Sequence, residues 1–181
     1  MKSLVLTAWL LLGVPSESHP AEPIRIEVSY RAKRKWTASP EAILREVADP
    51  MRFPGLMPGL QRVQQVAPGV WLWETETAVP LAAPQRNRFR VQLMTQGDSL
   101  AIWRSVSDAD PDWLECRAQL RRPSAQEVSL ELEFRMRLVR PSLTSVHWLA
   151  PVVGERFLRE RVRERLIAMV EGFLERLQSR L

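Results

Sequence analysis

The sequence predicts an α+β domain in which an antiparallel sheet of about seven strands packs against one long C-terminal helix. Three observations lead to this fold class. Apolar and polar residues alternate over residues 24–30 and again over six segments between residues 60 and 139, which is typical of strands. A Ser-Pro helix start follows the first strand. From about residue 154 to the C-terminus, apolar residues recur at helical spacing.

The segment after the first strand predicts one or two short helices. Ser39 is a favoured N-cap residue, and Pro40 suits the first helical position because its missing N–H would have no partner there. Apolar residues at 42–44 and 47 supply a buried face, and Asp49-Pro50 ends the helix. A second helical turn is expected over residues 51–53.

Six strands in a meander are expected after residue 60. Pro68-Gly69 and the segment 96–98 are turn signals, and Pro123 lies in the loop between the last two strands. Strands joined by such short links pair antiparallel. The expected strands span 60–67, 70–79, 87–95, 99–106, 113–120 and 127–139.

Only one face of this sheet is expected to be buried. Phe89, Val91 and Leu93 share the apolar face of their strand, while Arg88 and Arg90 face outward, where Glu74 and Glu76 on the neighbouring strand can pair with them. The inward parity of Trp71 and Trp73 is left open, because Val70 and Leu72 compete with them. The last strand alternates most regularly, with Val128, Leu130, Leu132, Phe134, Met136 and Leu138 on its apolar side.

The C-terminal helix must bury its apolar stripe against the sheet. Its core-facing residues are expected to be Leu158, Val162, Leu166, Met169, Phe173 and Leu177. Arginine and glutamate alternate over 155–165, which is typical of a solvated helix face. The net charge of +5 therefore does not indicate a nucleic-acid partner. An anionic membrane surface is the favoured charged partner, since lipid head groups attract basic faces.

The N-terminus has the pattern of a secretory signal. Met1-Lys2 is basic, Ser3 to Val14 is uncharged and rich in leucine, and Ser16 and Ser18 precede a cleavage point before His19. The run is too short to span a bilayer, which needs about 20 apolar residues. We expect a signal peptide over 1–18, a domain over 19–181, and a periplasmic or secreted protein. The alternative is a first strand or a mis-assigned start codon, in a cytoplasmic protein.

The sequence carries no recognisable catalytic, cofactor or metal motif. Asp108, Asp110 and Asp112 match the first spacings of a calcium loop, but Trp113 stands where glycine is required. These residues are interpreted as a solvated turn. Cys116 lies in a strand without a nearby histidine and is expected to be a buried structural thiol. His147 remains a candidate acid or base, or else a packed or surface residue.

The order of elements, with the segment from Ser39-Pro40-Glu41 through Ala48-Asp49-Pro50 to the Phe53-Pro54-Gly55-Leu56-Met57-Pro58-Gly59 turn, resembles the START-like superfamily, also called SRPBCC or the helix-grip fold. The resemblance covers residues 24–181 and is nearest to the polyketide cyclase/dehydrase and lipid transport branch. It implies that the sheet curves around the terminal helix and leaves an apolar cavity. In this family such cavities carry lipids, sterols, quinones or polyketides, and only sometimes catalyse.

Large apolar residues suit such a cavity, because aromatic rings contribute contact area and methionine adapts to irregular shapes. The same residues could instead fill a solid core. The expected function is the binding or carriage of a hydrophobic small molecule. The alternative is a cyclase- or hydrolase-like enzyme that uses His147, Arg104 or Glu115 in the same cavity. The candidate ligand-binding residues are Trp73, Phe89, Trp103, Phe134, Met136, Trp148, Met169 and Phe173, with Trp71 and Phe157 as further candidates.

Overall fold

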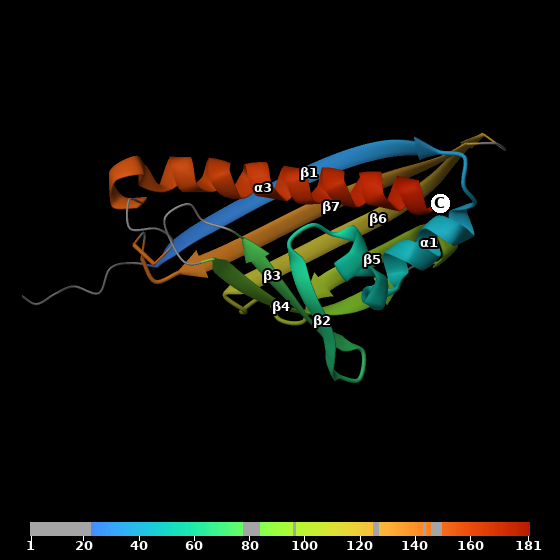
Figure 1. The fold of residues 1–181 in the computed structure, drawn as a ribbon. Coiled ribbons are helices and arrows are strands. Elements are labelled where there is room, and N and C mark those ends of the chain that lie inside the picture. Colours follow the sequence, from blue (N-terminus) through green and yellow to red (C-terminus); the bar gives the residue numbers. More distant parts are fainter. Residues whose placement is uncertain (1–22, 78–83, 96, 125–126, 143, 146–149) are drawn as a thin grey trace, which may run out of the picture.

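The structure is a computed structural model that describes residues 23–77, 84–95, 97–124, 127–142, 144–145 and 150–181. One curved antiparallel sheet packs against a long C-terminal helix, α3, which lies along its concave face (Figure 1). The strands are β1 (Ile24–Trp36), β2 (Leu60–Ala67), β3 (Val70–Thr77), β4 (Gln85–Thr95), β5 (Leu100–Ser105), β6 (Asp112–Ser124) and β7 (Glu127–Arg140). The helices are α1 (Pro40–Ala48), η1 (Pro50–Arg52), α2 (Phe53–Leu56), η2 (Gly97–Ser99) and α3 (Ala150–Arg180).

The sheet has seven strands in the order β1-β7-β6-β5-β4-β3-β2. Strands β2 to β7 form the expected meander, in which each strand pairs with the next one along the chain. Strand β1 instead pairs with β7 over its whole length, from Ile24 opposite Arg140 to Trp36 opposite Val128. The expected fold class is therefore confirmed, and among the described strands the only paired neighbours that are distant in sequence are β1 and β7.

The local signals for α1 act as expected. The Ser39 hydroxyl accepts a hydrogen bond from the Ala42 N–H at 3.1 Å, and Pro40 is the first helical residue. Asp49 both ends α1 and caps η1, because its side chain accepts from the Met51 N–H at 2.9 Å. This cap starts a further helical stretch, η1 and α2, that is longer than the single turn predicted.

The hairpin between β6 and β7 is tighter than the sequence predicts. A loop was expected over 121–126, but β6 continues to Ser124 and β7 begins at Glu127. The pairing shifts register between Arg121 and Ser124, so Pro123 lies in an irregular part of the ladder. Proline cannot donate to a regular ladder but is tolerated at such irregularities, which explains how a strand passes through it.

On each strand, the alternate residues that were expected to face the core do so. Trp73 is fully buried, so the open choice on β3 is settled in favour of Trp71 and Trp73. On the outward face, Arg88 pairs with Glu74 at 2.9 Å as expected. The other expected pair is different: Glu76 bonds Arg86 at 2.8 Å, while Arg90 reaches Asp110 at 3.4 Å, because Arg86 is the residue directly opposite Glu76.

Helix α3 faces the sheet with the expected stripe: Leu158, Leu166, Phe173 and Leu177 are buried, with Val170 and Leu174 in addition, and Val162 and Met169 are partly buried. Gly154, at φ 81°, interrupts the helical conformation near its start, and glycine tolerates this left-handed region. Phe157 is an exception among the apolar residues, since it is 44% exposed and lies against the Arg161 guanidinium at 5.1 Å. Consecutive helical residues lie about 100° apart, so Phe157 sits beside the stripe that contains the buried Leu158.

Two contacts fix the position of α3. At its C-terminal end, the buried Glu46 carboxylate accepts from Arg52 and from Arg180, the latter at 3.2 Å, which joins α3 to α1. Farther along, a Cβ on Gly172 would lie 2.7 Å from the Pro58 ring. Glycine at this position therefore lets the helix approach the turn that precedes β2. No helix among the described residues is long and apolar enough to cross a membrane.

Candidate functional site

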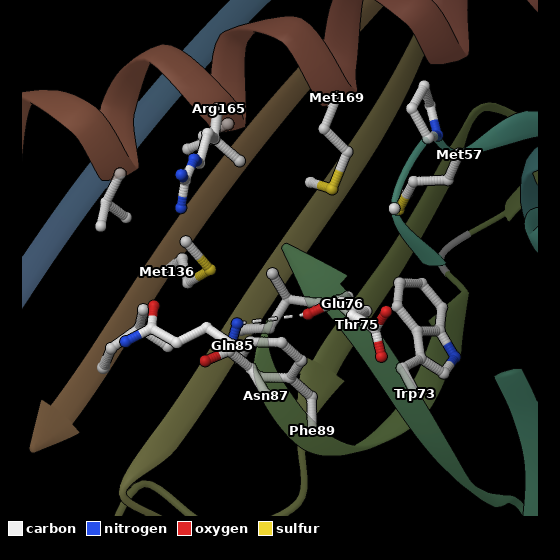
Figure 2. Close-up of a pocket in the computed structure, with 16 residues that line it drawn as sticks. Met57, Trp73, Thr75, Glu76, Gln85, Asn87, Phe89, Met136, Arg165 and Met169 are labelled. Atoms are coloured by element: carbon white, nitrogen blue, oxygen red, sulfur yellow. Dashed lines mark hydrogen bonds between the residues drawn. The ribbon is translucent and has the colours of Figure 1, made fainter. Parts of the chain in front are cut away.

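A pocket lies between α3 and the concave face of the sheet (Figure 2). Its volume is about 90 Å³. Gln85 and Arg165 at its edge are only partly buried, so the pocket reaches solvent on that side. The lining comes from the turn Met57–Gly59, from α3, and from strands β3, β4, β6 and β7. The register of the sheet thus brings together residues that are far apart in sequence.

Four of the predicted ligand-binding residues line this pocket: Trp73, Phe89, Met136 and Met169. Figure 2 shows Met136 and Met169 opposite each other, one on the sheet and one on α3. Both are partly buried, whereas Trp73 and Phe89 are almost completely inaccessible to solvent. Trp148, and with it His147, lies outside the described residues.

Three other predicted residues belong to the packed core and are not part of the pocket lining: Trp103, Phe134 and Phe173. Phe53, which was not among the predicted site residues, packs against two of them and against Trp73. Its ring centroid lies 4.8 Å from that of Trp73, 5.6 Å from Phe173 and 5.9 Å from Trp103. The Trp103 indole N–H donates to the Val47 carbonyl at 3.0 Å, which fixes the ring in place.

One end of the pocket is polar. The Asn87 amide donates to the Thr75 hydroxyl at 3.3 Å and accepts from Arg140. Arg140 in turn binds Asp112 at 2.5 Å, and both members of this ion pair are mostly shielded from water. A buried polar group needs such partners, because an unpaired one costs about 1–3 kcal/mol. The network thus holds Asn87 and Thr75 in fixed orientations beside the apolar lining.

Arg165 is the basic side chain among the described lining residues. Burial lowers its pKa, and repulsion from Arg161 lowers it further. The charge pattern predicts Arg165 on the solvated face of the helix, but Arg165 lies three residues after Val162 and four before Met169, on the same stripe. A charged residue on the apolar stripe was the signal that could have identified it.

Ligand pockets for drug-sized molecules usually measure about 300–1,000 Å³. The present cavity, at about 90 Å³, is smaller than that range. Three methionines line it: Met57, Met136 and Met169. Their unbranched side chains have several rotatable bonds and can move at low cost. A ligand longer than a few carbon atoms would therefore require these side chains to shift.

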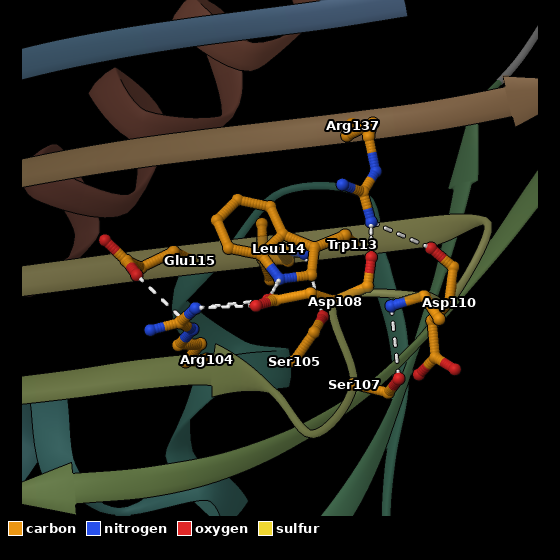
Figure 3. Close-up of polar contacts among 10 residues, drawn as sticks. Arg104, Ser105, Ser107, Asp108, Asp110, Trp113, Leu114, Glu115 and Arg137 are labelled. Atoms are coloured by element: carbon orange, nitrogen blue, oxygen red, sulfur yellow. Dashed lines mark hydrogen bonds and ion pairs between the residues drawn. The ribbon is translucent and has the colours of Figure 1, made fainter. Parts of the chain in front are cut away.

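Arg104 and Glu115, considered as polar groups of an enzymatic cavity, lie on the convex face of the sheet instead (Figure 3). There the Trp113 ring packs near the guanidinium groups of Arg104 and Arg137, at 5.9 and 5.7 Å from its centroid. The Trp113 indole donates to Asp108 at 2.9 Å, and Arg104 donates to both oxygens of that carboxylate at 3.1 Å. These hydrogen bonds, chiefly the one from Arg104, lower the pKa of Asp108.

The three aspartates of the calcium-like spacing do not converge on one point. Asp108 faces Arg104, Asp110 faces Arg90 at 3.4 Å, and Asp112 belongs to the ion pair with Arg140. Within the part of the chain that the structure describes, no group of three or more His, Cys, Asp or Glu residues is placed to hold a metal ion.

Cys116 is buried on the inward side of β6. Burial strongly raises the pKa of its thiol, and the nearby Glu115 carboxylate adds to this effect. The thiolate is the reactive form of cysteine, so this group is poorly suited to act as a nucleophile. The interpretation of Cys116 as a structural thiol is consistent with this position.

Solved structures share this architecture at low sequence identity. A START superfamily protein from Mycobacterium smegmatis is 16% identical, with a TM-score of 0.59, over 84% of this chain and 95% of that one. The Zhui aromatase/cyclase from Streptomyces sp. R1128 is 14% identical, with a TM-score of 0.54, over 85% of this chain and 93% of that one. This chain has the START-like fold.

The START-like fold also occurs in the di-domain ARO/CYC StfQ from the steffimycin biosynthetic pathway, which is 12% identical with a TM-score of 0.57. The match covers 85% of this chain but only 50% of StfQ, so the chain spans half the length of that protein. No protein-family model and no curated protein matches the sequence. At these identities the comparisons establish the START-like fold of the chain and nothing more specific.

Proposed function

We propose that the protein binds a hydrophobic small molecule in the pocket between α3 and the sheet. The observation that carries the proposal is the composition of the lining, in which Trp73, Phe89, Met136 and Met169 present apolar surface around a space that is open on one side. Burial of apolar ligand surface contributes about 25 cal/mol per Å². The START-like fold supports the same function, since the START superfamily protein and the aromatase/cyclases are built on it.

Blocking the pocket tests this proposal. Met169→Trp would place a large ring in the cavity, whereas Met94→Trp makes the same change at an exposed position of β4. Binding is measured with a neutral naphthylamine probe, whose emission rises in apolar surroundings and which accepts energy from tryptophan. We expect the wild type and Met94→Trp to bind the probe and Met169→Trp to lose it. Equal binding by all three proteins would place the site elsewhere.

A cyclase- or hydrolase-like enzyme is the second candidate. It is favoured by the polar end of the pocket, where Asn87 and Thr75 lie beside the apolar lining and Arg140 supports Asn87. Turnover of an aryl ester with a short apolar chain tests it. Activity that is lost in Asn87→Ala but kept in Met94→Trp would support catalysis in the pocket, and the absence of turnover would leave binding alone as the function.

We also propose that the chain is exported and that it works at an anionic membrane surface. The signal-like pattern of residues 1–18 supports export, although these residues lie outside the described part of the structure. After cleavage, the intact mass of protein isolated from its own cells should match a chain that begins at His19. A mass that includes Met1 would contradict export.

The exposed Phe157 and the exposed arginines around it support the membrane surface as partner. Phe157→Ser should weaken binding to vesicles that contain anionic lipid. Binding that does not depend on Phe157, or no binding at all, would exclude this face of α3.

A further inference from the structure

The concave face of the sheet changes from apolar to polar toward one end. On each of four strands, an inward apolar residue is followed, two positions nearer this end, by an inward polar residue. The pairs are Trp73 and Thr75 on β3, Phe89 and Asn87 on β4, Leu114 and Asp112 on β6, and Leu138 and Arg140 on β7. Because residues two apart on a strand face the same side, these polar groups lie beside the pocket and not behind it. The pocket is therefore amphipathic along its length.

At this polar end, the charge of Arg140 is balanced by the Asp112 carboxylate. Its guanidinium binds the Asp112 carboxylate at 2.5 Å and the Asn87 amide oxygen, so a positive and a negative charge cancel within the protein. Glu76, which also contributes to the lining, sits at an outward position of β3 and pairs with Arg86 at 2.8 Å. The charges of Arg140 and Glu76 are thus each balanced by a neighbouring side chain.

Arg165 lines the pocket from α3, together with Val162 and Met169. Figure 2 shows its side chain extending from α3 toward the sheet, on the side of the pocket where Gln85 and Met136 lie. Desolvation by burial lowers its pKa, and this effect with the repulsion from Arg161 exceeds the attraction of Glu164. A partly desolvated guanidinium gains more from a second anion than a solvated one does, since Coulomb attraction grows as the surroundings become less polar.

We infer that the pocket takes an amphipathic carboxylic acid, whose chain occupies the apolar lining and whose carboxylate binds the Arg165 guanidinium. The planar guanidinium matches a carboxylate in a two-point hydrogen-bonded geometry, which a hydroxyl or an ester does not reproduce. The volume of about 90 Å³ is far too small for a two-chain lipid, and a single chain of medium length enters only if the lining methionines shift. This inference rests on the proposed binding function and specifies its ligand class.

Decanoic acid and decanol test the inference, because they share a chain and differ in the head group. Binding of each to the full-length protein is measured by calorimetry at neutral pH, where the acid is ionised. We expect the wild type to bind decanoate at least about tenfold more tightly than decanol, as a charge-assisted hydrogen bond predicts. Arg165→Gln should abolish this preference and leave decanol binding within about twofold.

Arg163→Gln is the matched control, since Arg163 lies on the same helix with its side chain 49% exposed. It should keep the wild-type preference, and Arg165→Lys should keep part of it because the charge remains. Equal wild-type binding of acid and alcohol, or a preference that survives in Arg165→Gln, would overturn this inference and leave the proposed function in place. If neither ligand binds to the folded wild type, the proposed function itself fails.

Discussion

Replacing Phe173 with alanine should destabilise the fold by about 4 kcal/mol. Phe173 is 1% exposed and its ring stacks on Phe53, with centroids 5.6 Å apart and an angle of 23° between the planes. A buried aromatic side chain removes roughly 150 Å² or more from water, which at about 25 cal/mol per Å² contributes about 4 kcal/mol. Alanine retains a small part of this burial, but the lost ring pair adds about 0.5–1.5 kcal/mol.

Phe157→Ala is the matched control, because it makes the same change on the same helix at a side chain that is 44% exposed. It removes a ring that is nearly half exposed, together with its contact with Arg161, and should change the free energy of unfolding by less than about 1 kcal/mol. Both variants gain the same helix propensity from alanine, so their difference isolates burial. The assay is urea unfolding followed by tryptophan fluorescence. Similar losses in both variants would refute the assigned orientation of α3.

Three further predictions follow from local contacts. Ser39→Ala should lower the free energy of unfolding by about 1 kcal/mol because α1 loses its N-cap, while Ser39→Asp, which can still cap, should not; urea unfolding distinguishes them. Cys116 should resist a thiol reagent in the native protein and react in denaturant, and full labelling without unfolding would contradict its burial. The Tyr30 hydroxyl donates to Glu171 at 2.6 Å, and this bond raises the pKa of Tyr30 above 10.0. The folded state therefore keeps this proton to higher pH than the unfolded state does. The difference in free energy of unfolding between wild type and Tyr30→Phe should be fully present below pH 10 and should decline as the pH rises above 10. A difference that does not change with pH would contradict this.

The elements could be predicted because their signals are local. Alternation along β7 reports which face is buried, and the Ser39 cap with Pro40 marks the start of α1 without reference to the rest of the chain. The ends of the β6–β7 hairpin were harder to predict from the sequence. Whether β6 stops before Pro123 or passes through it depends on how the ladder shifts register, and that is decided by the partner strand.

The pocket could be predicted only in part, because its lining depends on tertiary packing. Periodicity identifies Trp73 and Trp103 as inward residues alike, yet one lines the pocket and the other is enclosed by Phe53 and Val47. The choice depends on where α2 and α3 close over the sheet. Arg165, in contrast, could have been predicted, because its position between Val162 and Met169 places it on the apolar stripe of the helix. The alternating charges around it favoured a solvated position instead.

The pairing of β1 with β7 has a consequence for the order in which the protein is built. β1 is made first, but its partner residues, from Val128 to Arg140, follow about 100 residues later, so the strand must wait with its backbone donors and acceptors unpaired. The meander from β2 to β7 closes through short loops and can form in the meantime. We expect amides of β4 and β5 to gain protection before those of β1 in pulsed hydrogen exchange during refolding. An interval of this kind gives β1, a strand with an apolar face, time to pair with another chain.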